Sequence, residues 1–409
     1  MDKETNKRTG SGNTRILITR YQSPRIKKNC LVTGILEGER LMEVHCEDPE
    51  SPSILGNIYV GRVEKVMPDI HAAFVEISRG VKGYLPLEDC RNPVFIKKIN
   101  SPSLVQGDEL LVQVSKENLK TKLPVLTANI SFTGSYLVLT TGNQKLGVSA
   151  KIRKEKKEEL KALFADIPRD DFGIILRTNA KDADSGVLME EFHRLCGELK
   201  QLVEQAGYRT CFSCLKQSPP EYLNVLKNSY YAGLNEIVTD IPEIYEDILG
   251  RMGEILDREG ISVRLYENPM LPLGALYNLD RQIIRGLDTK VWLKSGGYLI
   301  IEPTEALTVI DVNTGKSVTK KKPQEHFLKL NKEAAAEIAL QLRLRNISGI
   351  IIIDFIDLKK KEDRAELMKT LAEAVGKDPV PVQVVDMTPL NLVELTRKKV
   401  SKSLKEQLT

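Results

Sequence analysis

The sequence predicts an α/β protein made of several domains, and three observations support this fold class. The chain has 409 residues, a length that corresponds to about two to four domains. Apolar runs rich in Val and Ile at 307–310 and 349–353 flank a helical pattern, as in a strand–helix–strand unit with parallel strands. Between 57 and 114, short apolar runs alternate with Gly, Pro and Asp turns, which is typical of a small β-barrel.

Composition and charge narrow the class of protein further. Hydrophobic residues make up 41% of the chain and charged residues 28%, which favours a globular protein over a disordered one. No apolar run approaches the roughly 18 residues that span a bilayer, and residues 1–13 are polar and lack the apolar core of a signal peptide. We therefore expect a disordered tail at 1–13 and a cytoplasmic protein. The formal net charge of +4 means that a polyanion site must come from local clustering.

The barrel-like segment offers groups that suit a nucleic acid. Phe74 and Tyr84 lie on its predicted strands, where aromatic side chains can stack on bases. The alternative for Phe74 is a place in the barrel core, whereas Tyr84, directly after a glycine, is expected to be exposed. Charge for a phosphate backbone is available from Lys65, Lys82, Lys116, Lys120 and Lys122.

From residue 128 to 207 the pattern changes to strands and helices. A charged amphipathic helix is predicted at 151–164, a strand at 172–180 and a second helix at 190–206. The strand ends in Arg177 and Thr178, a guanidinium fork and a hydroxyl that together suit a terminal phosphate. The alternative is a structural salt bridge of Arg177.

After the Pro219–Pro220 break, the chain returns to helical or mixed patterns. Residues 221–257 are interrupted at Pro242, and a helix is predicted at 279–288. At the end of the chain, 396–408 has the pattern of a basic amphipathic helix, whose default interpretation is a solvated face.

Two aspartates end the apolar runs near the C-terminus. Asp311 and Asp354 follow the two predicted strands, and a right-handed crossover through a helix at 331–345 would place both at one edge of the sheet. The apolar face of that helix is formed by Ala334, Ala335, Ile338, Ala339 and Leu342. Carboxylates are rarely buried alone, so the pair suggests a shared cation or a charged substrate.

A hard cation fits this group of side chains better than zinc does. Asn313 lies two residues after Asp311 and therefore points to the same face of an extended strand. Two carboxylates and an amide oxygen suit Mg²⁺ or Mn²⁺. The alternative is that both aspartates are caps or strand-end residues bonded to backbone.

The cysteines do not suggest a disulfide scaffold or a strong zinc site. Six cysteines occur, with one C-x-x-C formed by Cys211 and Cys214 and only four histidines in the chain. We expect this pair to lie in the core of a strand, with a redox pair as a lesser alternative.

The order of these segments resembles the catalytic half of the ribonuclease E/G family of bacterial endoribonucleases, and the resemblance extends from about residue 14 to the end. The long block SGGYLIIEPTEALTVIDVNTGK (295–316) and EAAAEIALQLRLRNISGIIIIDFIDL (333–358) is its most specific part. Shorter matching segments are 134–139, 176–178 and 391–399.

The resemblance implies a domain layout. It predicts a ribonuclease H-like subdomain split between 14–52 and 223–286, an OB-fold RNA-binding domain at 53–128, and a 5′-sensor subdomain at 129–222. A deoxyribonuclease I-like catalytic subdomain is expected at 287–409. The family's Cys-Pro-x-Cys zinc link and small dimerisation domain are not expected within this chain, which ends at Thr409. Zinc is accordingly not expected, and a homodimer is left open.

The resemblance also implies site residues. Asp311 and Asp354 would hold a catalytic Mg²⁺, and Asn313 would orient the site by hydrogen bonding. Lys316 is either a phosphate contact or a solvated loop lysine.

The expected RNA contacts in the OB domain are Phe74, Tyr84 and Lys122, with Tyr84 replacing the usual Phe. Arg177 and Thr178 match a pocket that prefers a 5′-monophosphate, and the backbone around Gly134 and Val138 would line it.

The activity that follows from the resemblance is Mg²⁺-dependent cleavage of single-stranded RNA, in rRNA and tRNA processing and in mRNA decay. Products would have 5′-phosphate and 3′-hydroxyl ends. The alternatives are a non-catalytic RNA-binding protein of the same fold and a metal-dependent deoxyribonuclease or other phosphodiesterase.

Overall fold

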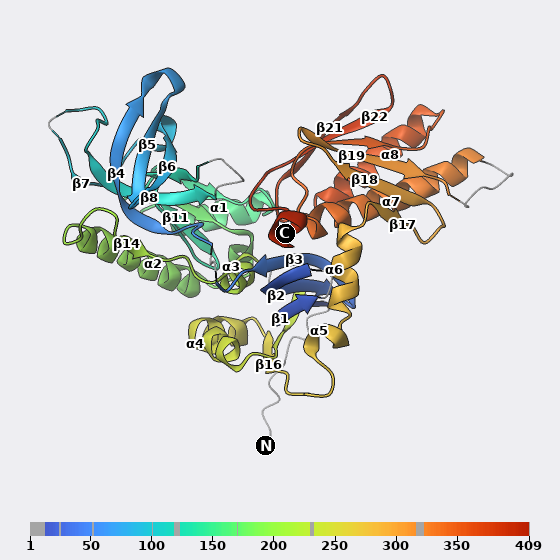
Figure 1. The fold of residues 1–409 in the computed structure, drawn as a ribbon, viewed down its shortest axis with the longest axis horizontal. Coiled ribbons are helices and arrows are strands. Elements are labelled where there is room, and N and C mark those ends of the chain that lie inside the picture. Colours follow the sequence, from blue (N-terminus) through green and yellow to red (C-terminus); the bar gives the residue numbers. More distant parts are fainter. Residues whose placement is uncertain are drawn as a thin grey trace. The chain divides into compact units, whose positions relative to one another are not determined.

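The computed structural model of the protein separates into two compact units (Figure 1). The inserted unit is Pro52–Ala232, and the split unit combines Met1–Ser51 with Gly233–Thr409. Described residues are 13–23, 26–50, 53–99, 101–117, 123–169, 171–229, 233–315 and 323–408. Lys120, Lys122 and Lys316, three of the predicted phosphate contacts, lie outside them. The finer boundaries expected inside each unit remain predictions.

The inserted unit begins with a closed barrel of five strands, OB-like in its order. The strands follow the order β4–β5–β6–β9–β8, and pairing of β8 with β4 closes the ring. The strands are β4 (Ile58–Met67), β5 (Ala72–Ser78), β6 (Val81–Pro86), β8 (Glu109–Lys116) and β9 (Val125–Thr127). Two short strands, β7 (Phe95–Lys97) and β14 (Cys214–Lys216), extend the sheet beyond the ring.

The barrel forms because its strands alternate apolar and polar residues, so that every second side chain points inward. The interior is filled by Val63, Ala73, Val75, Ile77, Leu85, Leu110, Val112, Val114 and Leu126. The Leu126 side chain packs so closely on Gly83 that an added Cβ there would lie 2.5 Å from it. The residues between the inward-facing ones, among them Phe74 and Tyr84, are left on the outer surface.

In its described residues, the rest of the inserted unit is a four-stranded sheet with three α-helices. The sheet order is β10–β11–β13–β12. Its strands are β10 (Ser131–Thr133), β11 (Leu137–Thr140), β12 (Leu146–Val148) and β13 (Gly173–Leu176). The helices are α1 (Lys154–Leu163), α2 (Ser185–Ala206) and α3 (Glu221–Asn228).

The split unit contains two sheets, and the first of them is built from both of its chain segments. Its order is β16–β15–β1–β2–β3. The strands are β1 (Thr14–Ser23), β2 (Ile26–Glu37), β3 (Arg40–Glu47), β15 (Leu234–Thr239) and β16 (Ser262–Leu265). The helices of this part are α4 (Pro242–Arg258), α5 (Leu273–Leu276), α6 (Leu279–Leu287) and α9 (Leu404–Leu408).

The second sheet of the split unit holds the predicted aspartates. Its order is β17–β18–β19–β20–β22–β21. The strands are β17 (Lys290–Trp292), β18 (Tyr298–Pro303), β19 (Leu307–Asn313), β20 (Gly349–Asp354), β21 (Val382–Met387) and β22 (Leu392–Arg397). Two helices, α7 (Pro323–Leu344) and α8 (Lys361–Val375), pack on one face of it.

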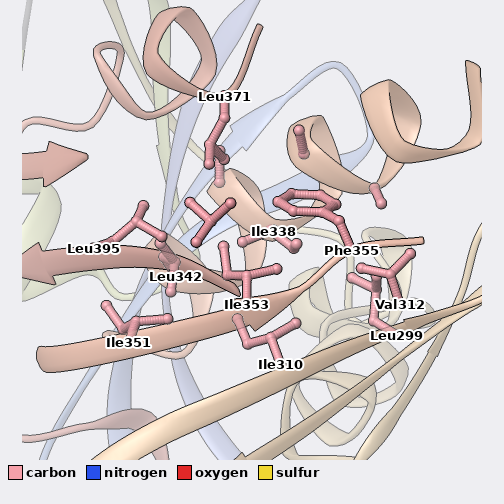
Figure 2. Close-up of a cluster of buried hydrophobic side chains, with 14 of the residues drawn as sticks. Leu299, Ile310, Val312, Ile338, Leu342, Ile351, Ile353, Phe355, Leu371 and Leu395 are labelled. Atoms are coloured by element: carbon pink, nitrogen blue, oxygen red, sulfur yellow. The ribbon is translucent and has the colours of Figure 1, made fainter. Parts of the chain in front are cut away.

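The core between this sheet and its helices explains the orientation of the strands (Figure 2). Ile310 and Val312 of β19 and Ile351 and Ile353 of β20 are buried against the helices. The expected apolar face of α7 is confirmed, since Ala334, Ala335, Ile338, Ala339 and Leu342 all belong to this core. Because side chains alternate along a strand, the residues between the buried ones point to the opposite face of the sheet.

Four local predictions were wrong. The strand expected at 172–180 ends at Leu176, and Thr178–Lys181 forms a 3₁₀ helix. Helix α7 begins at Pro323 rather than at residue 331, and proline suits the first turn of a helix. Thr396 and Arg397 continue strand β22, and only Leu404–Leu408 is helical near the end of the chain. Cys214 is exposed on β14 and not in a strand core. None of the helices in the described part of the chain has the length and apolar character needed to cross a bilayer.

Candidate functional site

Asp311 and Asp354 lie directly opposite each other in the six-stranded sheet. Strands β19 and β20 are parallel, and their register pairs Asp311 with Asp354. Neighbouring strands lie about 4.8 Å apart, so the two carboxylates extend from adjacent backbones. Both belong to the face away from α7 and α8, because their neighbours Ile310, Val312 and Ile353 belong to the core. The predicted parallel arrangement of the two strands, with a helix between them in the chain, and the placing of both acids together are therefore confirmed.

Asn313 lies on the same face and contacts the first acid. Its Nδ2 donates a hydrogen bond of 2.7 Å to Oδ2 of Asp311. This bond fixes the orientation of the Asp311 carboxylate. Just beyond it the chain turns at Gly315, with φ of 57°, where an added Cβ would be 2.4 Å from the Gly296 carbonyl oxygen. Only glycine permits this close approach, which holds the end of β19 against the β17–β18 hairpin.

The electrostatics of the pair favour a positively charged occupant. Burial, together with the charges of Asp311 and Asp357, raises the pKa of Asp354. The negative charge of Asp311 therefore disfavours ionisation of Asp354, and a cation between the two side chains would relieve this repulsion. Among the described residues, no group of three or more His, Cys, Asp or Glu side chains is arranged to hold a metal ion. Two carboxylates nevertheless suffice for Mg²⁺, which keeps several of its waters when bound to proteins.

A residue outside the predicted site fixes the chain just after Asp354. Asn331 of α7 is fully buried. Its Nδ2 donates to the Ile356 carbonyl at 2.7 Å, and its Oδ1 accepts from the Ile356 N–H at 3.1 Å. The amide thereby satisfies both backbone groups of a residue in the stretch that joins Asp354 to Asp357. This role was not predicted from the sequence, where the signal for it was a polar residue next to the apolar face of a helix.

The predicted aromatic pair lies on the outer surface of the barrel. Phe74 and Tyr84 are opposite each other on β5 and β6, with ring centroids 6.2 Å apart in an edge-to-face arrangement. Both are half-buried, so Phe74 is not simply a core residue and Tyr84 is less exposed than expected. Lys65 is exposed and lies opposite Phe74 on β4. Lys82, by contrast, forms an ion pair of 2.6 Å with Glu64, which makes it less available to a phosphate.

Arg177 is half-buried and fixed by three hydrogen bonds. It donates to the Gly134 carbonyl at 2.6 Å, to the Lys227 carbonyl at 2.8 Å and to Oδ1 of Asn228 at 2.7 Å. The last two partners lie at the C-terminal end of α3, where a cation is favoured by the helix dipole. These bonds give Arg177 a structural role that differs from the salt bridge considered as the alternative. They also bring Arg177 and Gly134 together.

The other predicted residues of this pocket are close to the same strands. Thr178 shares a hydrogen bond of 2.9 Å with Ser149. Gly134 is buried, and an added Cβ would lie 2.4 Å from Cδ of Glu191. The Glu191 carboxylate accepts the backbone N–H groups of residues 135, 136 and 137 at 2.8–3.0 Å, which fixes the turn after Gly134. Val138 is half-buried on β11, opposite Ile175 of β13.

The fold and the site together define the class: a mixed α/β protein with an OB-like barrel and a pair of opposed aspartates on an α/β sheet. Comparison with known proteins then gives the family. The model of the Ribonuclease E/G family matches residues 131–400. Two similar proteins are named Ribonuclease G. That of Salmonella typhimurium (strain SL1344) is 35% identical over 91% of this chain and 78% of its own length, and that of Escherichia coli (strain K12) is 34% identical over the same shares.

A third relative, named Ribonuclease E, comes from Synechocystis sp. (strain ATCC 27184 / PCC 6803 / Kazusa) and is 36% identical over 86% of this chain and 53% of its own length. The chain belongs to the ribonuclease E/G family.

Proposed function

We propose that this protein is an endoribonuclease that hydrolyses internal phosphodiester bonds of single-stranded RNA. The observation that supports this proposal most directly is the pairing of Asp311 with Asp354 on the face of the sheet away from the helices, with Asn313 bonded to Asp311. Relatives named Ribonuclease G and Ribonuclease E, similar over most of this chain, support the same reaction class. The processing of rRNA and tRNA and the decay of mRNA are the roles we propose for it.

Mg²⁺ is the cofactor that we propose, with Mn²⁺ as a substitute. The donor set is two opposed carboxylates, of which Asp311 raises the pKa of Asp354, and this fits a divalent cation with hard oxygen ligands. When bound, such a cation would activate a water molecule and stabilise the charge that develops on the scissile phosphate. Asp311 and Asp354 would bind it, and Asn313 would hold the Asp311 carboxylate in place. Hydrolysis would leave 5′-phosphate and 3′-hydroxyl ends.

The outer surface of the barrel is the proposed contact for the rest of the strand. Unpaired bases can turn outward and stack on aromatic side chains, and Phe74 and Tyr84 form such a pair. The exposed Lys65 next to Phe74 can neutralise a phosphate. Lys122 and Lys316 remain proposed contacts. Single-stranded RNA is favoured because stacked bases in a duplex cannot reach these rings.

A preference for 5′-monophosphorylated RNA is the final part of the proposal. The Arg177 guanidinium, held by its protein partners, would supply positive charge, and the Thr178 hydroxyl lies beside it in the chain. A monophosphate would be attracted by this charge. Gly134 and Val138 would line the pocket, with Gly134 placed by its contact to Arg177.

The experiment that tests the proposal compares wild type with Asp311→Asn and Asp354→Asn. Each is incubated with a single-stranded RNA that has either a 5′-monophosphate or a 5′-hydroxyl, in Mg²⁺ or in EDTA. We expect wild type to cleave in Mg²⁺ only, to prefer the monophosphate, and to lose cleavage but not RNA binding in both variants. Cleavage that survives in the variants would exclude this site.

Two further outcomes decide between the alternatives. RNA binding by wild type without any cleavage would indicate a non-catalytic RNA-binding protein of this fold. A single-stranded DNA of the same sequence is the control for substrate class, and equal cleavage of DNA would indicate a general phosphodiesterase. End-labelling of the products checks the 5′-phosphate and 3′-hydroxyl ends.

A further inference from the structure

The protein's single tryptophan is exposed on the sheet that holds the acid pair. Trp292 ends strand β17 and has 60% of its surface accessible to solvent. Its ring lies against Tyr298 of β18, with centroids 5.3 Å apart and an interplanar angle of 61°. Burying an indole would contribute favourably to folding. A tryptophan that remains mostly exposed despite these neighbours is therefore available for a contact outside the chain.

The strand register places this aromatic pair on the same face as Asp311. Trp292 is opposite Tyr298, and Tyr298 is opposite Asn313. Directly paired residues point to the same face of a sheet, so these three side chains form one row across β17, β18 and β19. The adjacent row contains Lys290, Ile300, Asp311 and Asp354. Since strands lie about 4.8 Å apart, the Trp292 backbone is about 10 Å from that of Asn313.

A lysine completes the group and gives it a positive charge. Nζ of Lys290 lies 4.1 Å from the centroid of the Trp292 ring and 3.7 Å from that of Tyr298. These cation–π contacts hold the rings in place and put an ammonium group beside them. An aromatic surface beside a cation matches a base and the phosphate attached to it.

We propose that Trp292, supported by Tyr298 and Lys290, stacks on a base of the RNA strand close to the scissile phosphate. This inference rests on the proposed function, because it assumes that the strand lies across Asp311 and Asp354. Stacking tolerates every base, so the contact would position the strand and would not read its sequence. The single-stranded nature of the substrate would thus be recognised beside the acids as well as on the barrel.

Fluorescence of this one tryptophan gives a direct test. The protein with both Asp311→Asn and Asp354→Asn is titrated with a single-stranded RNA, and with a ribose-phosphate oligomer of equal length that lacks bases. We expect quenching by the RNA and much weaker quenching by the abasic oligomer. An equal response to both, or no response at saturation, would overturn the proposal.

Cleavage kinetics supply the second test, in a protein whose two acids are intact. Trp292→Ala should raise KM by about fivefold to a hundredfold, the range for the loss of one stacked base, while kcat changes much less. Trp292→Phe should restore most of the loss. The matched control is Tyr208→Ala, which removes another highly exposed aromatic residue, from the inserted unit, and should leave KM unchanged.

The outcomes separate this inference from the proposed function. Normal KM in Trp292→Ala, together with loss of cleavage in Asp311→Asn, would refute the stacking site and leave the nuclease intact. Base-dependent quenching by a protein that never cleaves RNA would support the stacking site and refute the nuclease. A change in sedimentation mass on Trp292→Ala, with RNA binding unchanged, would identify a second copy of the chain as the occupant and overturn the proposal.

Discussion

Asn331 provides the sharpest structural test of the candidate site. Its amide makes two hydrogen bonds to the backbone of Ile356, of 2.7 and 3.1 Å. Asn331→Ala would leave both backbone groups without this partner. Each buried polar group that loses its partner costs about 1–3 kcal/mol. Because Ile356 is only half-buried, the lower part of that range applies, and the free energy of unfolding should fall by about 2–4 kcal/mol.

The matched control comes from the same helix. Gln324 of α7 accepts the Lys359 N–H at 2.8 Å in an exposed position, so Gln324→Ala should change stability by less than about 0.5 kcal/mol. Urea unfolding is followed by the fluorescence of Trp292, which lies in the same unit as both residues. RNA cleavage is measured in parallel and should fall about 10- to 100-fold in Asn331→Ala, because Asp354 is displaced. Equal stability and activity of the two variants would refute this reasoning.

Three other perturbations have outcomes that the structure specifies. Asp354→Asn should stabilise the metal-free protein by less than about 1 kcal/mol at pH 7. Partial burial and the neighbouring acids raise the pKa of Asp354, so its negative charge is unfavourable above that pKa, but the exposure of the side chain keeps the effect small. Thermal melts of the variant should also lose any Mg²⁺-dependent shift. Gly134→Ala should destabilise the protein by about 1–3 kcal/mol, since the added Cβ would overlap the Glu191 side chain. The control Gly147→Ala should not, because its added Cβ would lie 3.6 Å from the nearest atom. Urea unfolding followed by circular dichroism checks both variants. Glu43→Gln should remove an acid-sensitive contribution to the free energy of unfolding. Burial raises the pKa of Glu43, but the hydrogen bond from His45 and the charge of Arg343 outweigh this effect and lower the pKa to about 2. That stability is complete above about pH 4.5 and is lost as pH falls toward 2, so wild type and variant should converge in acid melts.

The pairing of the two acids could be predicted because it depends on local patterns. Each aspartate ends an apolar run of strand length, and the helix between the runs requires a crossover, which is right-handed in nearly every known case. These rules fix the neighbours without any knowledge of distant contacts. The closed barrel was predictable for the same reason, since short alternating strands with Gly and Pro turns have few ways to close.

Residues whose role depends on tertiary contacts could not be predicted in this way. Arg397 belongs to a basic run that favours a solvated helix, yet it is buried on β22 and pairs with Asp378 at 2.9 Å. Lys82 was expected to face phosphate and instead pairs with Glu64. Asn331 bonds a residue 25 positions later in the chain. In each case the partner is chosen by the packing of elements that no local pattern connects.

The exposed face of the six-stranded sheet has a consequence for which bonds can be cut. Enzymes that remove nucleotides from an end must recognise or enclose that end. Here Asp311 and Asp354 extend from neighbouring strands, and Val309, Ile350 and Trp292 are exposed. If RNA is cut at this acid pair, as proposed, a strand could lie across this surface at any point along its length. Incision in the middle of a transcript would then need no threading of a terminus.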